Sequence, residues 1–341
     1  MATFRDELEL KGDPRRVDDA GVERLDRALA AAAGVPVERV LHAIDPRRVL
    51  AFQAGGPPVW SVAVAPCADG GFLFLTYGLS RAVEPDARFE HELSLRAPAA
   101  PNGQPPQWPT FLLRQLCRYQ ITSGRELRVG DPMSFGKSIT RAAMAPQHEA
   151  SMPDSPLTTV AVVADPAIEG ARRVVGLRPE EHALAELWST AGLMAELAKR
   201  DPTLETDIRR GSWADDAELR AAVEAGAKRE GSQTGAMVIA GLRWREQGAE
   251  GVVLRLPGGA TMKRLVALID GRLGFGRNLL LHDFEPAPHS EVGLVPSESD
   301  FVRTHGGRML ELGLAPGSPT LKALRDAAAQ PDPPGVDLRF S

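Results

Sequence analysis

The first segment whose residue types suggest chemistry is a potential phosphate-binding loop at residues 131–138. It reads DPMSFGKS and ends in the Gly-Lys-Ser sequence with which a Walker P-loop also ends. Such a loop needs a further glycine five positions before the Gly-Lys pair, but that position is Asp131, and Gly130 lies one residue too far away. Pro132 also removes one of the backbone N–H groups that a P-loop offers to phosphate. The pattern therefore favours a polar surface loop over a nucleotide site.

Two further segments match active-site motifs only in part. Residues 78–82 read GLSRA and lack the closing glycine of a GxSxG nucleophile elbow, so we interpret Ser80 as a turn or capping serine. Residues 271–276 read GRLGFG, and their glycines stand in the wrong order for a dinucleotide-binding fingerprint. This second segment predicts a turn.

A candidate metal site is formed by His282, Asp283, Glu285 and His289, four potential ligands in a short stretch. Two intervening prolines work against their convergence, so a polar loop is the preferred interpretation, and metal binding at this stretch stays open. No residue is assigned to a metal, and we find no clear catalytic constellation in the chain. This favours a binding protein that needs no cofactor.

The composition predicts a globular chain of two domains. Its 341 residues exceed the length of about 250–300 residues at which a single core stops growing. Hydrophobic residues make up 43% and charged residues 25% of the chain, as is usual for globular proteins. The net charge of −5 gives no electrostatic attraction to nucleic acid. We therefore expect no DNA or RNA partner.

The sequence also bears on the cellular compartment. No apolar run approaches the roughly 20 residues of a membrane span, and the N-terminus, MATFRDELEL, has acidic residues where a signal peptide needs an apolar segment. A cytoplasmic protein without a membrane partner is expected. Cys67 and Cys117 form no CxxC pair, so we predict that both are buried and that neither forms a disulfide or binds a metal.

The first part of the chain alternates between helix and strand patterns. Apolar residues recur every three or four positions over 18–33, which predicts a helix. Residues 59–75 are apolar on both sides of a turn at 68–71 and predict a hairpin, and the strict alternation of FEHELSLR at 89–96 predicts a half-buried strand. Thr110 is expected to cap the helix that contains 112–119. Further strands are expected at 158–164 and 172–177, and helices at 179–197 and 217–228.

A second, smaller and mainly β domain is expected beyond a joint at 246–251. Strand character appears at 237–244 before the joint, and after it at 252–256, 265–269, 279–281 and 309–314. The end of the chain, from 327, is rich in proline and is expected to be a flexible tail. The predicted fold class is α/β or α+β, with a mixed sheet and flanking helices in the first domain.

Several of these segments occur in the order found in the Suppressor of fused family. The series is Tyr-Gly-Leu-Ser at 77–80, FEHELSLR, PPQWP at 105–109, Gly-Asp at 130–131, VVGLRPEE at 174–181 with Trp188, Thr-Asp-Ile-Arg-Arg-Gly at 206–211, Glu-Gly-Ser at 230–232 continuing to Trp244, and more weakly VVLRL and 271–277. The chain resembles this family over roughly residues 50–320, and most strongly before 245.

The resemblance implies a two-domain, non-enzymatic and cytoplasmic protein-binding module. In animals the family sequesters transcription factors of Hedgehog signalling, and its two lobes close on a partner peptide that adds as a β-strand. Bacterial relatives act as immunity proteins in toxin systems and neutralise toxins encoded beside them. The Ala-, Arg- and Pro-rich composition is typical of a GC-rich bacterial genome, so the resemblance implies a bacterial immunity protein that grips an extended segment of a nearby toxin between its lobes.

The resemblance also implies a domain plan. Residues 1–48 would be an N-terminal helical extension, 49–246 the family's N-terminal domain, 250–326 its C-terminal domain, and 327–341 the flexible tail. The oligomeric state, the identity of the partner and any movement of the lobes are not encoded in a pattern that we can interpret.

The residues that match the family's peptide cleft are Tyr119, Asp131, the strand at 236–242 with Ala236 and Val238, and Arg277. Tyr119 would provide an aromatic wall and Asp131 a charge for a donor of the partner. The strand would pair with the peptide by β-augmentation, and Arg277 would lie on the closing side. A turn acid is the alternative for Asp131, and a core aromatic is the alternative for Tyr119.

Other matching residues are expected to support this site. Trp108 would anchor the proline-rich loop and fix the helix that carries Tyr119, or else serve only as a core residue. Trp188, Asp207 and Arg209 would belong to the scaffold. The sequence departs from the animal pattern at Phe135 and Ala164 and lacks the long insertion of the animal C-terminal half, so the animal ligand is not expected.

Two alternatives come from other classes of function. One is a hydrolase that depends on a metal at 282–289 or on a nucleotide at 136–138. The other is a rigid intracellular scaffold protein whose lobes are packed together without a cleft.

Overall fold

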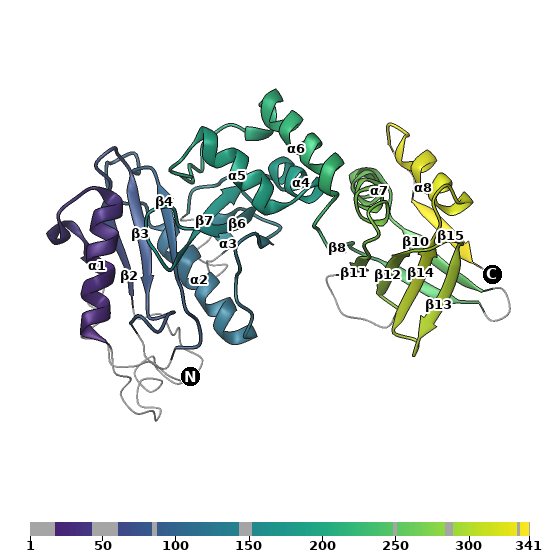
Figure 1. Cartoon of the computed structure of the whole chain (residues 1–341), viewed down its shortest axis with the longest axis horizontal. Helices are drawn as coiled ribbons and strands as arrows, with labels where there is room; N and C mark the ends of the chain where they lie inside the picture. The colour runs from purple at the N-terminus through teal and green to yellow at the C-terminus, as the bar shows by residue number, and fades with distance from the viewer. Residues whose placement is uncertain are drawn as a thin grey trace. The chain divides into compact units, whose positions relative to one another are not determined.

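The computed structural model describes residues 18–42, 61–83, 87–142, 152–247, 251–283, 289–332 and 335–340 (Figure 1). The chain divides into two compact units. The first consists of Met1–His182 and Met194–Trp213, and the second of Ala183–Leu193 and Ala214–Ser341. Among the described residues, no helix is long and apolar enough to cross a membrane.

The first unit is built on a seven-stranded sheet with the strand order β1-β2-β3-β4-β7-β6-β5. Neighbouring strands are antiparallel except β4 and β7, which are parallel. The predicted hairpin is confirmed as β2 and β3, joined by a turn in which Gly70 and Gly71 have positive φ. The strands are β1 (Leu41–His42), β2 (Ser61–Pro66), β3 (Phe72–Tyr77), β4 (Glu92–Ala97), β5 (Pro132–Ser134), β6 (Thr159–Ala164) and β7 (Ala171–Leu177).

Helices cover both faces of this sheet (Figure 1). The predicted first helix is confirmed as α1 (Asp19–Ala33), which begins where the Asp18 side chain accepts a hydrogen bond from the Ala20 N–H. It belongs to the expected N-terminal extension at 1–48, and its Val22, Leu25 and Leu29 pack against β2 and β3. On the other face lie α2 (Trp108–Ser123) and the short α3 (Ile139–Ala142).

The structure corrects the expectation that one face of the strand at 89–96 is exposed. Strand β4 lies inside the sheet, and both of its faces are buried: Glu92 is 2% exposed and Ser94 is fully buried. The polar face finds its partners inside the unit. Ser94 donates a hydrogen bond to Asp165, which also forms an ion pair with Arg173 at 2.9 Å. A buried polar network satisfies this face in place of water.

The predicted helix at 179–197 is two helices, α4 (Pro179–Leu187) and α5 (Thr190–Arg200). The break comes at Trp188 and Ser189, because the Ser189 side chain accepts a hydrogen bond from the Gly192 N–H at 2.9 Å and so caps the second helix. Thr110 is not a cap, since α2 already begins at Trp108.

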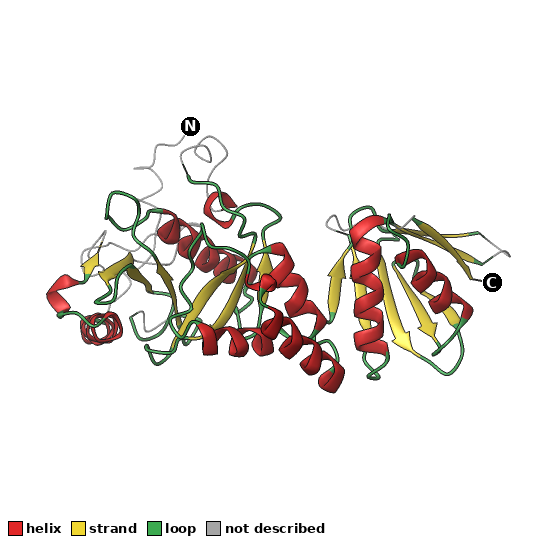
Figure 2. Cartoon of the chain, turned by 90° about the horizontal axis from the view of Figure 1, so that it is seen from above, coloured by secondary structure: helices red, strands yellow, loops and turns green. Residues whose placement is uncertain are grey.

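The second unit contains a five-stranded and a three-stranded sheet. Their orders are β13-β14-β12-β11-β8 and β15-β10-β9. Two helices pack with these sheets around one core (Figure 2). The elements are α6 (Ala217–Glu230), β8 (Ala236–Val238), β9 (Arg243–Glu246), β10 (Val252–Leu256), α7 (Gly259–Leu273), β11 (Leu279–His282), β12 (Glu291–Pro296), β13 (Phe301–His305), β14 (Met309–Leu314), α8 (Pro319–Ala328) and β15 (Val336–Phe340). Elsewhere, short 3-10 helices span Val37–Arg39 and Trp213–Asp215.

The structure corrects two expectations for this unit. The predicted strand at 265–269 lies within α7, whose buried Met262, Leu265, Leu268 and Ile269 recur at helical spacing. The expected flexible tail at 327–341 contains β15, which pairs antiparallel with β10. Strands β9 and β10, on either side of the expected joint at 246–251, are neighbours in one sheet. The described part of that segment therefore connects two strands of the same sheet.

Candidate functional site

The segment at 131–138 does not have the geometry of a phosphate-binding loop. It contains β5, an antiparallel strand at the edge of the sheet, and it leads into the four-residue helix α3. The Ser138 hydroxyl is buried and lies 2.7 Å from the Thr140 hydroxyl. A P-loop instead connects a strand to the N-terminus of a full helix that faces the phosphates.

The stretch at 282–289 is engaged in local contacts as far as it is described. Asp283 forms an ion pair with Arg243, and the His289 ring meets the Trp244 ring edge-on, with 4.4 Å between centroids. Glu285 lies outside the described residues. Across the described ranges, no three His, Cys, Asp or Glu side chains are placed to hold a metal ion.

Ser80 is a structural serine bound to a buried carboxylate. The Glu92 side chain accepts hydrogen bonds from the Thr76 hydroxyl at 2.6 Å, from the Ser80 hydroxyl at 2.8 Å, and from three backbone N–H groups at Gly78, Leu79 and Ser80. Burial raises the pKa of Glu92 to about 7, although these donors act in the opposite direction. Glu92 fixes the 78–80 loop, a role that the sequence analysis missed because it placed this acid on an exposed face.

His91 is a second buried titratable group, and it lies beside the same strand. Its Nε2 is 3.2 Å from the Gln120 side-chain oxygen, and its Nδ1 is 3.3 Å from the Glu126 carboxylate. Burial, helped by the charge of Arg172, lowers the pKa of His91 to about 4. The imidazole is therefore neutral at pH 7.

We expect the neutral His91 to make folding sensitive to acid. Its pKa falls from the ordinary 6.5 to about 4 on folding, so between these values the unfolded chain takes up a proton and the folded chain does not. The stability from this group is fully present above pH 6.5 and is lost as the pH falls toward 4, by about 2 kcal/mol at pH 4.5. Urea unfolding at pH 7 and at pH 4.5 measures how much unfolding free energy the protein loses in acid. We expect this loss to be smaller by about 2 kcal/mol in His91→Gln than in wild type. An equal difference in both proteins would contradict this assignment.

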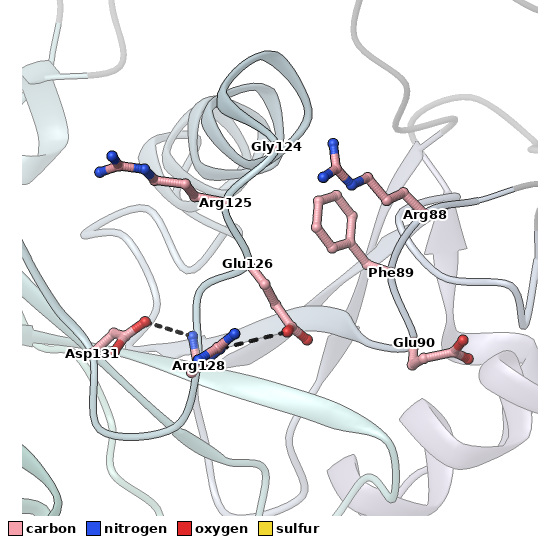
Figure 3. Close-up of a pocket in the computed structure, with 8 residues that line it drawn as sticks. All are labelled: Arg88, Phe89, Glu90, Gly124, Arg125, Glu126, Arg128 and Asp131. Carbon is pink, nitrogen blue, oxygen red and sulfur yellow. Dashed lines mark hydrogen bonds and ion pairs between the residues drawn. The ribbon is translucent and has the colours of Figure 1, made fainter.

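Asp131 lines a pocket of about 580 Å³ in the first unit (Figure 3). The pocket lies between residues 88–90, just before β4, and residues 124–131, between α2 and β5. Gly124 ends α2 with φ of 69°, which lets the chain turn into the second of these segments. The lining residues are Arg88, Phe89, Glu90, Gly124, Arg125, Glu126, Arg128 and Asp131.

The other two acids of this pocket have partners inside the unit, whereas Asp131 uses only one of its carboxylate oxygens among the described residues. One carboxylate oxygen of Asp131 accepts a hydrogen bond from the Arg128 N–H at 2.8 Å, and no described residue donates to the other oxygen. Asp131 thus serves as a turn acid and also faces the pocket. Glu90 lies 2.8 Å from Arg81, and Glu126 lies 2.7 Å from Arg172.

Tyr119 lies on α2, but it is not among the residues that line the pocket of Asp131. Its half-buried side chain packs against the core of the first unit, and its carbonyl accepts a hydrogen bond from the Ser123 hydroxyl at 2.6 Å. The structure therefore does not bring Tyr119 and Asp131 together in this pocket.

Strand β8 forms an edge of the five-stranded sheet, and its only strand partner among the described residues is β11. The two strands are parallel, and Gly235 and Ile239 bond to the backbone of Leu280 and His282. Alternate residues of a parallel strand bond to the same neighbour, so Met237 also faces β11. The N–H and C=O groups of Ala236 and Val238 point the other way.

These outward backbone groups form what we call the open margin, defined as the N–H and C=O groups of Ala236 and Val238. No hydrogen bond to them is found within the described part of the chain. Ala236 is exposed and Val238 is half-buried, while Met237 between them is buried in the core of the second unit. An unpaired edge of this kind is a template for another strand.

Arg277 lies next to the start of β8. Its Nη1 donates a hydrogen bond to the Ser232 carbonyl at 3.0 Å, and Arg272 donates to the same carbonyl at 3.1 Å. The structure thus places Arg277 beside the segment that leads into β8, at a residue four positions before Ala236. Arg272 was not among the residues predicted to form the site. Its position five residues before Arg277, across a glycine-rich turn, could have indicated that the two side chains lie close together.

Trp188 supports the segment that leads to β8. Its ring packs directly on two glycines. A Cβ atom would lie 2.3 Å from the ring at Gly226 and 2.6 Å from the ring at Gly192. The indole N–H donates to Glu230 at 2.7 Å, and the Trp188 carbonyl accepts from the Gln233 N–H at 2.7 Å. These contacts fix the chain just before the open margin.

The other supporting residues have local roles in the first unit. Trp108 is the first residue of α2 and is 3% exposed in the core. Asp207 accepts a hydrogen bond from the backbone N–H of Arg209 at 2.8 Å. The Nε of the exposed Arg209 side chain also lies 3.6 Å from the Asp207 carboxylate. The neighbouring Arg210, which also matches the family pattern, forms a buried ion pair with Glu181.

Comparison with known proteins relates this chain to one family. Residues 55–211 match the family model described as Suppressor of fused protein (SUFU). No curated protein matches the chain. The crystal structure of Drosophila Suppressor of Fused is similar over 92% of this chain and 90% of its own, with a TM-score of 0.62 and 15% sequence identity.

Two further solved structures show weaker similarity. A crystal structure of the Sufu-Fu complex matches over 63% of this chain and 98% of its own, with a TM-score of 0.46 and 17% identity. A putative SUFU homolog from Neisseria gonorrhoeae matches over 57% of this chain and 94% of its own, with a TM-score of 0.37 and 10% identity. The family match confirms the resemblance to the Suppressor of fused family over residues 55–211, and the fold is similar to that of the Drosophila protein.

Proposed function

We propose that this chain is a non-enzymatic protein-binding module that pairs an extended segment of a partner with the open margin of β8. The observation that carries the proposal is the outward direction of the backbone groups of Ala236 and Val238. An added strand would satisfy these groups with main-chain hydrogen bonds, and neighbouring side chains would select its sequence. The match to the Suppressor of fused family supports this role, because the sequence resemblance implies a protein-binding regulator.

The pocket of Asp131 is proposed as a second contact surface for a partner. Its volume of about 580 Å³ has room for several side chains, and Phe89 contributes an aromatic surface between charged groups. The free oxygen of Asp131 is placed to accept a hydrogen bond from a donor of the partner. Such a charge-assisted bond contributes about 1.5–3 kcal/mol.

We expect Asp131→Asn to weaken partner binding about tenfold without changing the midpoint of thermal unfolding. The amide oxygen of asparagine can still accept the hydrogen bond from the Arg128 N–H, so the turn keeps its shape while the charge is lost. Isothermal titration calorimetry with the purified partner measures the change. Glu23→Gln, an exposed charge loss on α1, is the matched control. Equal affinity of wild-type protein and Asp131→Asn would remove this pocket from the contact surface.

We propose further that the partner is a toxin encoded near this gene and that binding neutralises it. The family resemblance and the bacterial character of the composition support this finer assignment. Co-expression of each neighbouring candidate toxin with this chain tests it by cell growth. We expect one toxin to be neutralised by the wild-type chain and to co-purify with it. Growth arrest by every candidate despite expression of the chain would contradict the immunity role.

A further inference from the structure

Two guanidinium groups lie beside the segment at 232–235, which leads into the open margin. Arg272, near the end of α7, and Arg277, in the turn that follows, both donate hydrogen bonds to the Ser232 carbonyl. A Cβ atom at Gly235 would lie 3.9 Å from Nη2 of Arg272. Because Gly235 has no side chain, the Arg272 guanidinium is not screened from the residue that begins β8.

This pair of positive charges has no carboxylate partner among the described residues. No ion pair of Arg272 or Arg277 is found there, although six other arginines of the second unit have one. Hydrogen bonds from Trp188 and Arg229 lower the pKa of the nearby Glu230, and the charge of Arg277 adds to this effect. Burial and the charge of Arg277 lower the pKa of Arg272. The pair therefore keeps a net positive charge, because two guanidinium groups lie near one carboxylate that is already bound to Trp188 and Arg229.

The surface next to the pair is apolar. Leu280 of β11 stands opposite Ala236 and is 38% exposed, and Phe275 lies over Gly231 and is 41% exposed. These two exposed side chains provide apolar surface that a guest strand would cover. Charge, apolar surface and free backbone groups thus occur along residues 231–238, which comprise β8 and the segment that leads into it.

We propose that the segment which pairs with the open margin carries an acidic side chain that binds Arg272 and Arg277, together with an apolar side chain that covers Leu280. The inference rests on the proposed function, because it requires a guest strand on β8. A guanidinium offers several N–H donors in a planar fork that fits a carboxylate. Each arginine uses only some of these donors on backbone carbonyls, so others remain for the guest.

The test is a selection from a library of random hexapeptides displayed on phage, carried out in parallel with three forms of the full chain. The first form is wild type, the second is Arg272→Gln/Arg277→Gln, and the third is Ala236→Pro, which removes a donor of the open margin. Arg303→Gln/Arg308→Gln, an equal charge loss at exposed positions on the opposite edge of the same sheet, is the control. Thermal unfolding checks that each variant is folded.

We expect wild type and the control to select peptides with Asp or Glu at one fixed position, and these peptides to bind the Arg272→Gln/Arg277→Gln form at least about tenfold more weakly. Weaker binding of the same peptides in 0.5 M salt would support the charge contact. Peptides that depend on Ala236 but show no acidic position would overturn this inference and leave the proposed function standing. If wild type and Ala236→Pro enrich the same peptides or none, the proposed function fails, and the inference fails with it.

Discussion

Replacing Glu181 with alanine is expected to destabilise the first unit by about 3–5 kcal/mol. The Glu181 carboxylate is fully buried and accepts hydrogen bonds from both terminal nitrogens of Arg210. It also accepts hydrogen bonds from the backbone N–H groups of Arg178 at 2.8 Å and Trp213 at 2.7 Å. The alanine variant would leave all these donors unsatisfied and the guanidinium charge buried without a partner. Loss of one member of a buried pair is among the most costly single substitutions.

The other contacts of Arg210 hold its guanidinium in place when the Glu181 carboxylate is removed. Its guanidinium lies 3.4 Å from the ring centre of Trp213 and donates to the Gly176 carbonyl at 3.0 Å. The ion pair therefore ties β7, α4 and the segment at 210–213 together. We expect urea unfolding followed by tryptophan fluorescence to show an early loss of the first unit in Glu181→Ala.

Glu180→Ala is the control for this experiment. Glu180 is the neighbouring residue, half exposed, and 3.5 Å from Arg178, so its loss should cost no more than about 0.5 kcal/mol. A similar small effect in Glu181→Ala would show that the buried pair does not hold these elements together. Glu181→Gln, which keeps two acceptor positions on one oxygen, should fall between the two.

Ala236→Pro is expected to weaken partner binding about 100-fold while the second unit stays folded. Proline has no N–H, so a guest strand loses a hydrogen bond, and the ring occupies the place of the approaching backbone. Both effects act on the outer side of β8, because the bonds to β11 come from Gly235, Met237 and Ile239. Proline is tolerated at such edge positions.

Ala236→Thr separates the backbone donor from the side chain. Threonine keeps the N–H and favours strands, so its affinity should lie within about threefold of wild type. Surface plasmon resonance with the immobilised partner measures both variants, and thermal unfolding confirms that they are folded. Equal affinities of Ala236→Pro and Ala236→Thr would mean that the partner binds elsewhere.

Local patterns predicted the elements that local forces decide. The helix at 19–33 and the hairpin β2–β3 follow from apolar spacing and turn residues, and both were found where the sequence placed them. The exposed face assigned to β4 was wrong, because only tertiary contacts reveal that Glu92 and Ser94 bond to distant segments. Strand β15 was missed for a related reason, since its pairing with β10 joins segments about 80 residues apart.

The sequence resemblance named candidate site residues but could not give their geometry. The family resemblance pointed to Asp131, Ala236 and Val238, and the structure places Asp131 at a pocket and the other two at a sheet edge. Which backbone groups of β8 face outward depends on its register with β11, and that register is not encoded in the strand alone. The separate position of Tyr119, outside the pocket of Asp131, likewise depends on how α2 packs.

The most direct test of the open margin is amide hydrogen exchange of β8, residue by residue, in the free protein and with its partner. Met237 and Ile239 bond to β11, so their amides should exchange slowly in both states. The amides of Ala236 and Val238 should exchange rapidly in the free protein and become protected when the partner binds. Protection of all four amides in the free protein would show that the margin is already paired and would contradict the account.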